Sequence, residues 1–289
     1  MSGLVILNIA NGVATGAFYV LMALGLSLIL NLSGVINFAH GGFLALGGYF
    51  AYMLIPSVGF FGALLLAPIL TAIVGLIVEQ VLVRWLYGRD PLYSLLLTFG
   101  LAFIFQGGTR FLWGAQGLPM SIPAFLQQPL SSSLFFLTSY RVFNLVVVAA
   151  VVVLLFLLLR RTRFGIRIRA GTLDLDTVAS LGVNVRLLRS FNFALGIFLA
   201  GLGGVLAAGQ FRLDPTMGDD YLMPSFIAII VGGVGSLGGT VLGGLLIGIA
   251  TGVTTVFFPA ASEAVMYVMM AVVLLIRPRG LFGEEGLMT

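Results

Sequence analysis

The residues with the most obvious capacity for chemistry lie in GVINFAHGGF, residues 34–43. This stretch contains Asn37, the chain's only histidine (His40) and the pair Gly41-Gly42, and it lies within residues 1–78, which contain no Asp, Glu, Lys or Arg. On a continuous helix Asn37 and His40 would share a face, because residues three apart are neighbours. Buried polar side chains in so apolar a segment need partners or a polar path. Two interpretations stay open. The stretch lines a path or its gate, or its polar groups hold neighbouring helices in register.

The residue types that are missing exclude several kinds of site. Without cysteine there is no disulfide, thiol nucleophile or thiolate metal site, and a single histidine cannot build a multi-histidine metal site. All 14 basic residues are arginine, so the lysine of a phosphate-binding P-loop is missing. We therefore expect no catalytic residue, metal site or cofactor in this chain, and any hydrolysis of ATP would occur on another one.

The elements that position these residues are membrane helices. Of the 289 residues 60% are hydrophobic and 8% are charged, too few charges to cover a water-facing surface. The sequence predicts an all-α, polytopic membrane bundle that forms a single transmembrane domain over residues 1–289. About nine apolar segments are expected, at 4–31, 35–55, 59–83, 91–112, 141–159, 190–210, 221–234, 239–258 and 263–276. The seventh is short enough to be a broken or tilted helix.

Two patterns predict how the bundle is organised. GVINFAHGGFLALGG (34–48) has a loose echo in GVGSLGGTVLGG (233–244), which indicates an inverted repeat of segments 1–4 and 6–9, as found in transporters with a site near the membrane midplane. With the N-terminus in the periplasm, 11 arginines fall on the inner side and three on the outer side. The positive-inside rule therefore predicts a periplasmic N-terminus and a cytoplasmic C-terminus.

The longest polar segment is RRTRFGIRIRAGTLDLDTVASLGVNVRLLR, residues 160–189, which holds half of the arginines. The pattern from Leu173 to Leu181 predicts a short amphipathic helix that ends at Gly182. Two interpretations stay open here as well. The helix lies on the membrane surface against anionic lipid, or it fits a cleft on a soluble partner and transmits that partner's motion.

This segment resembles the cytoplasmic coupling segment of ABC importer permeases, most closely the H-type permease of branched-chain amino-acid (LIV) systems. Three further stretches are similar to motifs of that family: GLSLILNLSGVINFAHGGFLALGGYFA (25–51), IIVGGVGSLGGTVLGGLLIG (229–248) and RPRGLFG (277–283). One departure is Val178, where most members carry a small residue. By this resemblance the residues expected to couple to an ATPase are Arg169, Ala170, Asp174, Asp176, Ala179, Gly182, Val183 and Asn184.

The resemblance implies a permease subunit of an ATP-driven importer in the bacterial inner membrane. Branched-chain amino acids are the default solute, and urea, short amides and aromatic carboxylates are the alternatives. The implied partners are an M-type permease or a second copy of this chain, two cytoplasmic ATPase subunits that bind ATP and magnesium, a periplasmic solute-binding protein and membrane lipid, but no nucleic acid. Residues expected to line the solute path are Asn37, His40, Gly41, Gly42, Asn8 and Asn11.

Two other classes of function are a secondary transporter or channel and an intramembrane enzyme. An enzyme has almost nothing to build a site on, because the chain has no cysteine, one histidine and no paired carboxylates within a segment. Ion-coupled carriers place carboxylates deep in the bundle, whereas this chain has no acidic residue near the middle of a predicted segment. The nearest is Glu79, which we expect to form a local ion pair with Arg84. The residues therefore favour the importer permease.

Overall fold

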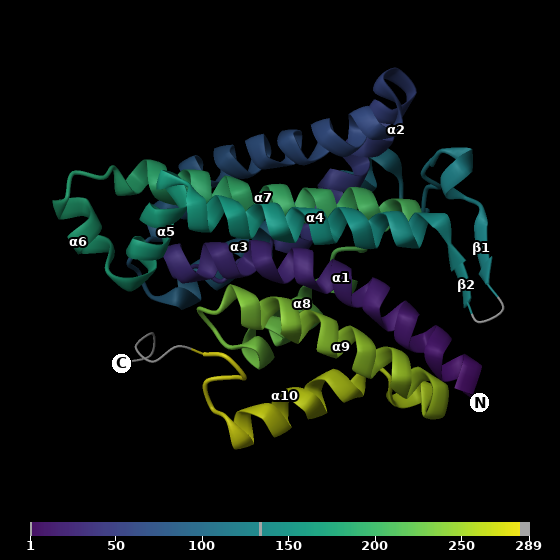
Figure 1. The fold of residues 1–289 in the computed structure, drawn as a ribbon. Coiled ribbons are helices and arrows are strands. Elements are labelled where there is room, and N and C mark those ends of the chain that lie inside the picture. Colours follow the sequence, from purple (N-terminus) through teal and green to yellow (C-terminus); the bar gives the residue numbers. More distant parts are fainter. Residues whose placement is uncertain (1, 133–134, 284–289) are drawn as a thin grey trace. The chain divides into compact units, whose positions relative to one another are not determined.

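The computed structural model describes residues 2–132 and 135–283 (Figure 1). Its α-helices are α1 (Ser2–Ser33), α2 (His40–Val81), α3 (Pro91–Trp113), α4 (Ser139–Arg161), α5 (Arg163–Leu173), α6 (Leu175–Ser180), α7 (Val185–Gln210), α8 (Asp219–Gly232), α9 (Leu237–Phe257) and α10 (Ala264–Ile276). Short 3-10 turns are η1 (Val83–Leu86), η2 (Ala124–Leu126) and η3 (Pro259–Ala261). The predicted polytopic helical class is confirmed. The sequence did not predict helix α5 or the antiparallel hairpin of β1 (Pro129–Ser132) and β2 (Phe135–Thr138).

Six of the helices, α1, α2, α3, α4, α7 and α9, are long and apolar enough to cross a membrane. Helix α2 has 42 residues, which at 1.5 Å per residue is about twice the thickness of a hydrocarbon core. It bends at Gly59 (φ 71°, ψ 174°), so the predicted segments 35–55 and 59–83 correspond to its two arms. Helices α8 and α10, with 14 and 13 residues, are shorter than a full crossing. The predicted number of nine spans is therefore approximate.

The chain separates into two compact units, which are described one at a time. Unit 1 consists of Met1–Leu24, Ile122–Ala149 and Asp220–Thr289, and unit 2 of Gly25–Ser121 and Ala150–Asp219. Helices α1 and α4 each contribute residues to both units. The single domain and the inverted repeat that the sequence suggests stay predictions.

Small residues bring the helices of unit 2 together. Gly47 of α2 faces the backbone of Gly201 of α7, and Gly204 of α7 faces the backbone of Leu44 of α2. A methyl group at Gly47 or Gly204 would collide with main-chain atoms of the other helix. Lipid tails are as apolar as the helices, so there is no hydrophobic driving force between the helices. Membrane helices gain packing energy instead from a close approach of their backbones.

In unit 1, glycines also allow α1 and α9 to approach closely: the backbones of Gly12 and Gly248 are in contact. Helix α8 leads into α9 through a tight turn in which Gly233 and Gly235 have φ values of 105° and 93°. The Ser236 hydroxyl then caps α9 by accepting a hydrogen bond from the Gly239 N–H at 3.0 Å. The echo motif 233–244 therefore forms a tight, locally stabilised turn followed by a helix.

Candidate functional site

The segment between α1 and α2, residues 34–39, is not helical and contains Asn37. Gly34 begins it in the left-handed region (φ 64°), which a glycine adopts without strain. Thr98 of α3 supplies hydrogen bonds to its backbone: the Phe38 N–H donates to Thr98 Oγ1 at 3.0 Å, and this hydroxyl lies 3.1 Å from the Ile36 carbonyl oxygen. We call residues 34–39 the helix break.

The prediction that Asn37 and His40 share a helical face is wrong, because Asn37 lies in the helix break and α2 begins at His40. Both side chains are nevertheless buried, with exposed fractions of 1% for Asn37 and 0% for His40. Asn37 Oδ1 and Nδ2 have no hydrogen-bond partner among the residues that the structure describes. Leaving a buried polar group without a partner costs about 1–3 kcal/mol. An amide kept at that cost is a candidate contact for a polar solute.

The His40 imidazole lies where three helices of unit 2 meet. A Cβ atom on Gly25 of α1 would be 2.9 Å from His40 Nε2 and 2.5 Å from the carbonyl oxygen of Gly196 in α7. Only a glycine at position 25 leaves room for both the ring and the close approach of α7. His40 is therefore tightly packed at this junction.

The glycine pair lies in the first turn of α2 rather than in the helix break. A Cβ on Gly41 would meet the Gly218 carbonyl oxygen at 2.8 Å, and one on Gly42 would meet the Phe105 ring at 2.7 Å. These contacts show close packing against the loop before α8 and against α3. That Gly41 and Gly42 line a solute path stays a prediction.

The other two predicted path residues belong to unit 1. Asn8 Nδ2 donates to the Leu4 carbonyl oxygen one turn earlier in α1, at 3.0 Å. Asn11 Oδ1 accepts a hydrogen bond from Arg141 Nη1 of α4. Their place on a solute path therefore also stays a prediction.

Two buried hydroxyl groups of unit 2 were missed by the sequence analysis. Thr98 is one, and Tyr49 of α2 is the other, with an exposed fraction of 0% and no hydrogen-bond partner for its hydroxyl among the described residues. Its ring centroid lies 4.7 Å from that of Trp113. The only signal in the sequence was a hydroxyl inside an apolar helix, which does not distinguish a lipid-facing position from an interior one.

The α5–α6 segment (residues 163–184) is a helical elbow between α4 and α7 (Figure 1). Side chains cap the N-termini of α5, of α6 and of α7, the helix that follows the segment. Thr162 Oγ1 accepts from the Gly165 N–H at 3.1 Å, and Asn184 Oδ1 accepts from the Leu187 N–H at 3.1 Å. Asp174 Oδ1 accepts from the backbone N–H groups of Asp176 and Thr177, both at 3.0 Å.

Hydrogen bonds from the Thr177 hydroxyl and N–H hold the pKa of Asp174 below its usual value, so this cap is ionised at neutral pH. Gly182, with φ at 83°, follows the end of α6 and confirms the predicted stop. A helix of six residues is marginal by itself, so these caps account for its order.

Some residues of this segment are buried against the protein, and others are exposed. Gly165, Ile168 and Gly171 of α5 and Val178 of α6 are buried. The coupling residues that are exposed are Arg169, Asp174, Asp176, Ala179, Gly182 and Asn184, whereas Ala170 and Val183 are half-buried. Leu173, the last residue of α5, and Leu181, which follows α6, are each 79% exposed.

Residues 8–275 match the family model described as the permease component of a branched-chain amino acid transport system. The chain belongs to this family. Two relatives align along nearly all of this permease. The high-affinity branched-chain amino acid transport system permease protein BraD of Pseudomonas aeruginosa is 30% identical, covering 96% of this chain and 95% of BraD. The corresponding protein LivH of Salmonella typhimurium is 28% identical, covering 95% of this chain and 94% of LivH.

Among solved structures, the permease aligns with PsaBC from Streptococcus pneumoniae in complex with Fab over 92% of this chain and 89% of that one. The TM-score is 0.46 and the sequence identity 14%, a similarity too low to transfer any feature.

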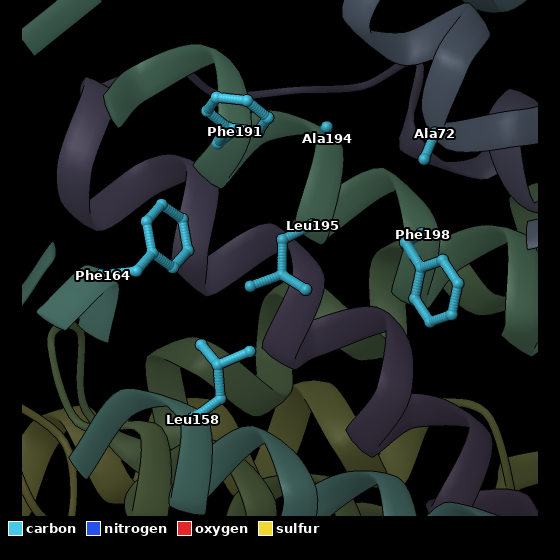
Figure 2. Close-up of a pocket in the computed structure, with 7 residues that line it drawn as sticks. All are labelled: Ala72, Leu158, Phe164, Phe191, Ala194, Leu195 and Phe198. Atoms are coloured by element: carbon cyan, nitrogen blue, oxygen red, sulfur yellow. The ribbon is translucent and has the colours of Figure 1, made fainter. Parts of the chain in front are cut away.

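Unit 2 of the permease also has an apolar groove of about 510 Å³ (Figure 2). Ala72 of α2, Leu158 of α4, Phe164 of α5 and four residues of α7 line it, namely Phe191, Ala194, Leu195 and Phe198. None of these side chains can donate or accept a hydrogen bond. The groove therefore offers nothing to a polar solute, in contrast to the amide of Asn37.

Proposed function

We propose that this permease is the membrane-spanning subunit of an ATP-driven importer and that it carries branched-chain amino acids. The family match supports the transport role, and the two relatives, named for branched-chain amino acid transport, support the solute. The single observation that carries the ATP-driven mechanism is the α5–α6 segment, a capped polar elbow with exposed leucines at both ends of α6. Such a surface suits a soluble ATPase subunit that pushes on it.

In this proposal the solute passes the helix break. The Asn37 amide has a donor and an acceptor that are both free of partners among the described residues, so it can bind an amino-acid carboxylate and ammonium group in turn. His40, Gly41 and Gly42 at the start of α2, with Asn8 and Asn11 of α1, complete the proposed path. One weak, reversible polar contact suits a path that must release its solute.

Contacts within unit 2 connect the elbow to the helix break. A Cβ on Gly171 of α5 would lie 2.8 Å from Leu32 Cδ1, and Leu32 is two residues before Gly34, where the helix break starts. Force on the proposed coupling residues, Arg169, Ala170, Asp174, Asp176, Ala179, Gly182, Val183 and Asn184, would therefore reach the break through one packed contact. Nucleotide-driven closure of two ATPase subunits would then change access to the path.

The proposed assembly contains an M-type permease or a second copy of this chain, two ATPase subunits and a periplasmic solute-binding protein. The N-terminus is placed in the periplasm and the C-terminus in the cytoplasm, supported by the distribution of arginine. ATP and magnesium bind the ATPase subunits in this scheme.

Gentle extraction of the tagged chain from its native membrane tests the proposal directly. Mass spectrometry of the purified complex should identify P-loop ATPase chains and a glycine-rich permease. The same complex in liposomes, with the binding protein added, should accumulate leucine only when ATP and magnesium are supplied. Recovery of the chain alone, with leucine uptake that is independent of ATP, would show that it is a secondary carrier.

A further inference from the structure

A polar pocket of about 270 Å³ lies in unit 2 and is not used by the proposed transport mechanism. Its lining consists of Arg84, Trp85 and Tyr87 from the turn after α2 and of Arg186 and Arg189 from the first turns of α7. Three guanidinium groups therefore surround one small volume, and none of the lining residues is acidic. We call it the arginine pocket.

The neighbouring acid, Glu79, does not form the expected ion pair with Arg84. It is 0% exposed, and its carboxylate oxygens accept hydrogen bonds from the Tyr87 hydroxyl at 2.8 Å and the Ser190 hydroxyl at 2.6 Å. The Arg84 guanidinium lies over the Trp85 ring instead, 5.0 Å from its centroid. Two hydroxyl donors thus compensate the buried charge of Glu79 and join the end of α2 to α7.

No acidic residue in the lining of the pocket balances its positive charge. Glu79 and Asp176 are near enough to attract Arg189, but neither lines the pocket. Arg189 lies over the Tyr87 ring at 4.6 Å, and its Nε is buried without a hydrogen-bond partner among the described residues. A buried guanidinium nitrogen without an acceptor is unfavourable. An anion in the pocket would supply that acceptor.

The position of the pocket on α7 adds to this charge. Helix α7 has no acidic residue in its first turn, and Arg186 and Arg189 stand near its positive, N-terminal end. Cations are unfavourable there and anions are favourable, because the exposed N–H groups point outward. The helix end and the arginines therefore both favour a bound anion.

The surroundings indicate which anion would fit. The pocket lies between the end of α2 and the start of α7, two helices long and apolar enough to cross a membrane. Trp85, which lines the pocket, is 60% exposed, and Leu187, the residue after Arg186 in the chain, is 52% exposed. Tryptophan prefers the membrane–water interface, and the leucine suits acyl chains.

We propose that the arginine pocket binds the phosphate of an anionic phospholipid, with Trp85 and Leu187 beside the upper part of its acyl chains. The bound lipid connects the end of α2 to the start of α7, and α7 follows the α5–α6 segment directly. This inference does not depend on the transported solute or on ATP.

Tryptophan fluorescence tests the proposal, because the chain has only two tryptophans, Trp85 and Trp113. The W113F variant leaves Trp85 as the sole reporter. The full chain is placed in phosphatidylcholine nanodiscs that contain equal fractions of brominated phosphatidylglycerol or brominated phosphatidylcholine. We expect brominated phosphatidylglycerol to quench Trp85 several-fold more strongly. The converse variant, W85F, should show no such preference at Trp113.

Matched variants decide whether the pocket is responsible. R84Q/R186Q should abolish the preference, and R84K/R186K, which keeps the charge and reports correct folding, should retain most of it. R160Q/R161Q removes the same charge from the exposed end of α4 and should change nothing. Equal quenching by both lipids in W113F would overturn the proposal, as would a preference that survives R84Q/R186Q. Loss of the preference on adding millimolar inorganic phosphate would instead show a site for free anions.

Discussion

The helix break and the α5–α6 segment interrupt the long helices in opposite ways. The backbone of the break is supported by Thr98 from another helix, and Ala39, before α2, provides no side-chain cap. The α5–α6 segment is stabilised by the local caps Thr162, Asp174 and Asn184. Val35, Asn37 and Ala39 of the break are buried, whereas the elbow exposes most of its charged residues.

Substitutions in the two regions should therefore affect stability and transport differently. A change in the break alters tertiary packing, so stability and transport should respond together unless the residue has no packing partner. A change at an exposed residue of the elbow that caps no helix, such as Arg169, removes only contacts with other molecules.

Reversing the charge of Arg169 should have the largest effect. R169E is expected to reduce ATP-driven uptake more than tenfold, because the exposed guanidinium would meet the ATPase surface with the wrong sign. Membrane insertion and the melting temperature should not change. R89E, an exposed arginine outside the elbow, is the matched control and should transport normally. Full uptake by R169E would exclude this residue from coupling.

Removing the amide of Asn37 should reduce uptake without loss of stability. N37A eliminates a buried polar group that has no partner among the described residues, so the free energy of unfolding should stay the same or increase. Leucine uptake in liposomes should decrease by about tenfold, the equivalent of 1.4 kcal/mol for one polar contact with the solute. Normal uptake together with reduced stability would assign Asn37 to packing instead.

Adding a methyl group at Gly25 should mainly destabilise unit 2. The new Cβ of G25A would collide with His40 and with the Gly196 carbonyl oxygen, and such overpacking costs about 1–3 kcal/mol. Thermal unfolding in detergent measures this cost. G100A in α3 is the control, because a Cβ there meets nothing within 4 Å. A stable G25A protein would show that α1 and α7 can separate at this junction.

Replacing Thr98 should have a somewhat smaller effect on the same region. T98V keeps the shape of the side chain but leaves the Phe38 N–H without its acceptor, at a cost of about 1–2 kcal/mol. T172V in the elbow removes only a local hydrogen bond to the Arg169 carbonyl oxygen and should cost less than about 0.5 kcal/mol. Similar losses in both variants would contradict the contrast between the two regions.

The smallest effect is expected from mild acid at Asp174. Because its pKa in the folded protein is lowered, the cap is fully present above the ordinary pKa of aspartate and is lost only as the pH falls through the lowered value. Hydrogen exchange of the α6 amides, corrected for intrinsic rates, should therefore show equal protection at about pH 7 and pH 5. D174A should lose that protection at both values. Loss of protection at pH 5 in the unmodified chain would show that the carboxylate is not the cap.

The sequence alone predicted the features that depend on composition and on local pattern. Apolar runs predicted most helices within a few residues, although α7 starts at Val185 rather than at residue 190. Within the elbow, the predicted helix from Leu173 to Leu181 corresponds to α6, whereas α5 was not predicted. Gly182 ended α6 as expected, since a positive φ is a local requirement that glycine meets.

Only the tertiary structure decided where the break lies and which polar groups have partners. Asn37 is outside α2, and Thr98, 61 residues later in the chain, accepts the hydrogen bond of the Phe38 N–H that a continuous helix would have satisfied internally. Glu79 interacts with Tyr87 and Ser190 rather than with Arg84 because α7 brings Ser190 to it across 111 residues. A sequence pattern reports the preferences of a segment, whereas a buried polar group is satisfied by whichever distant residue the packing brings within reach.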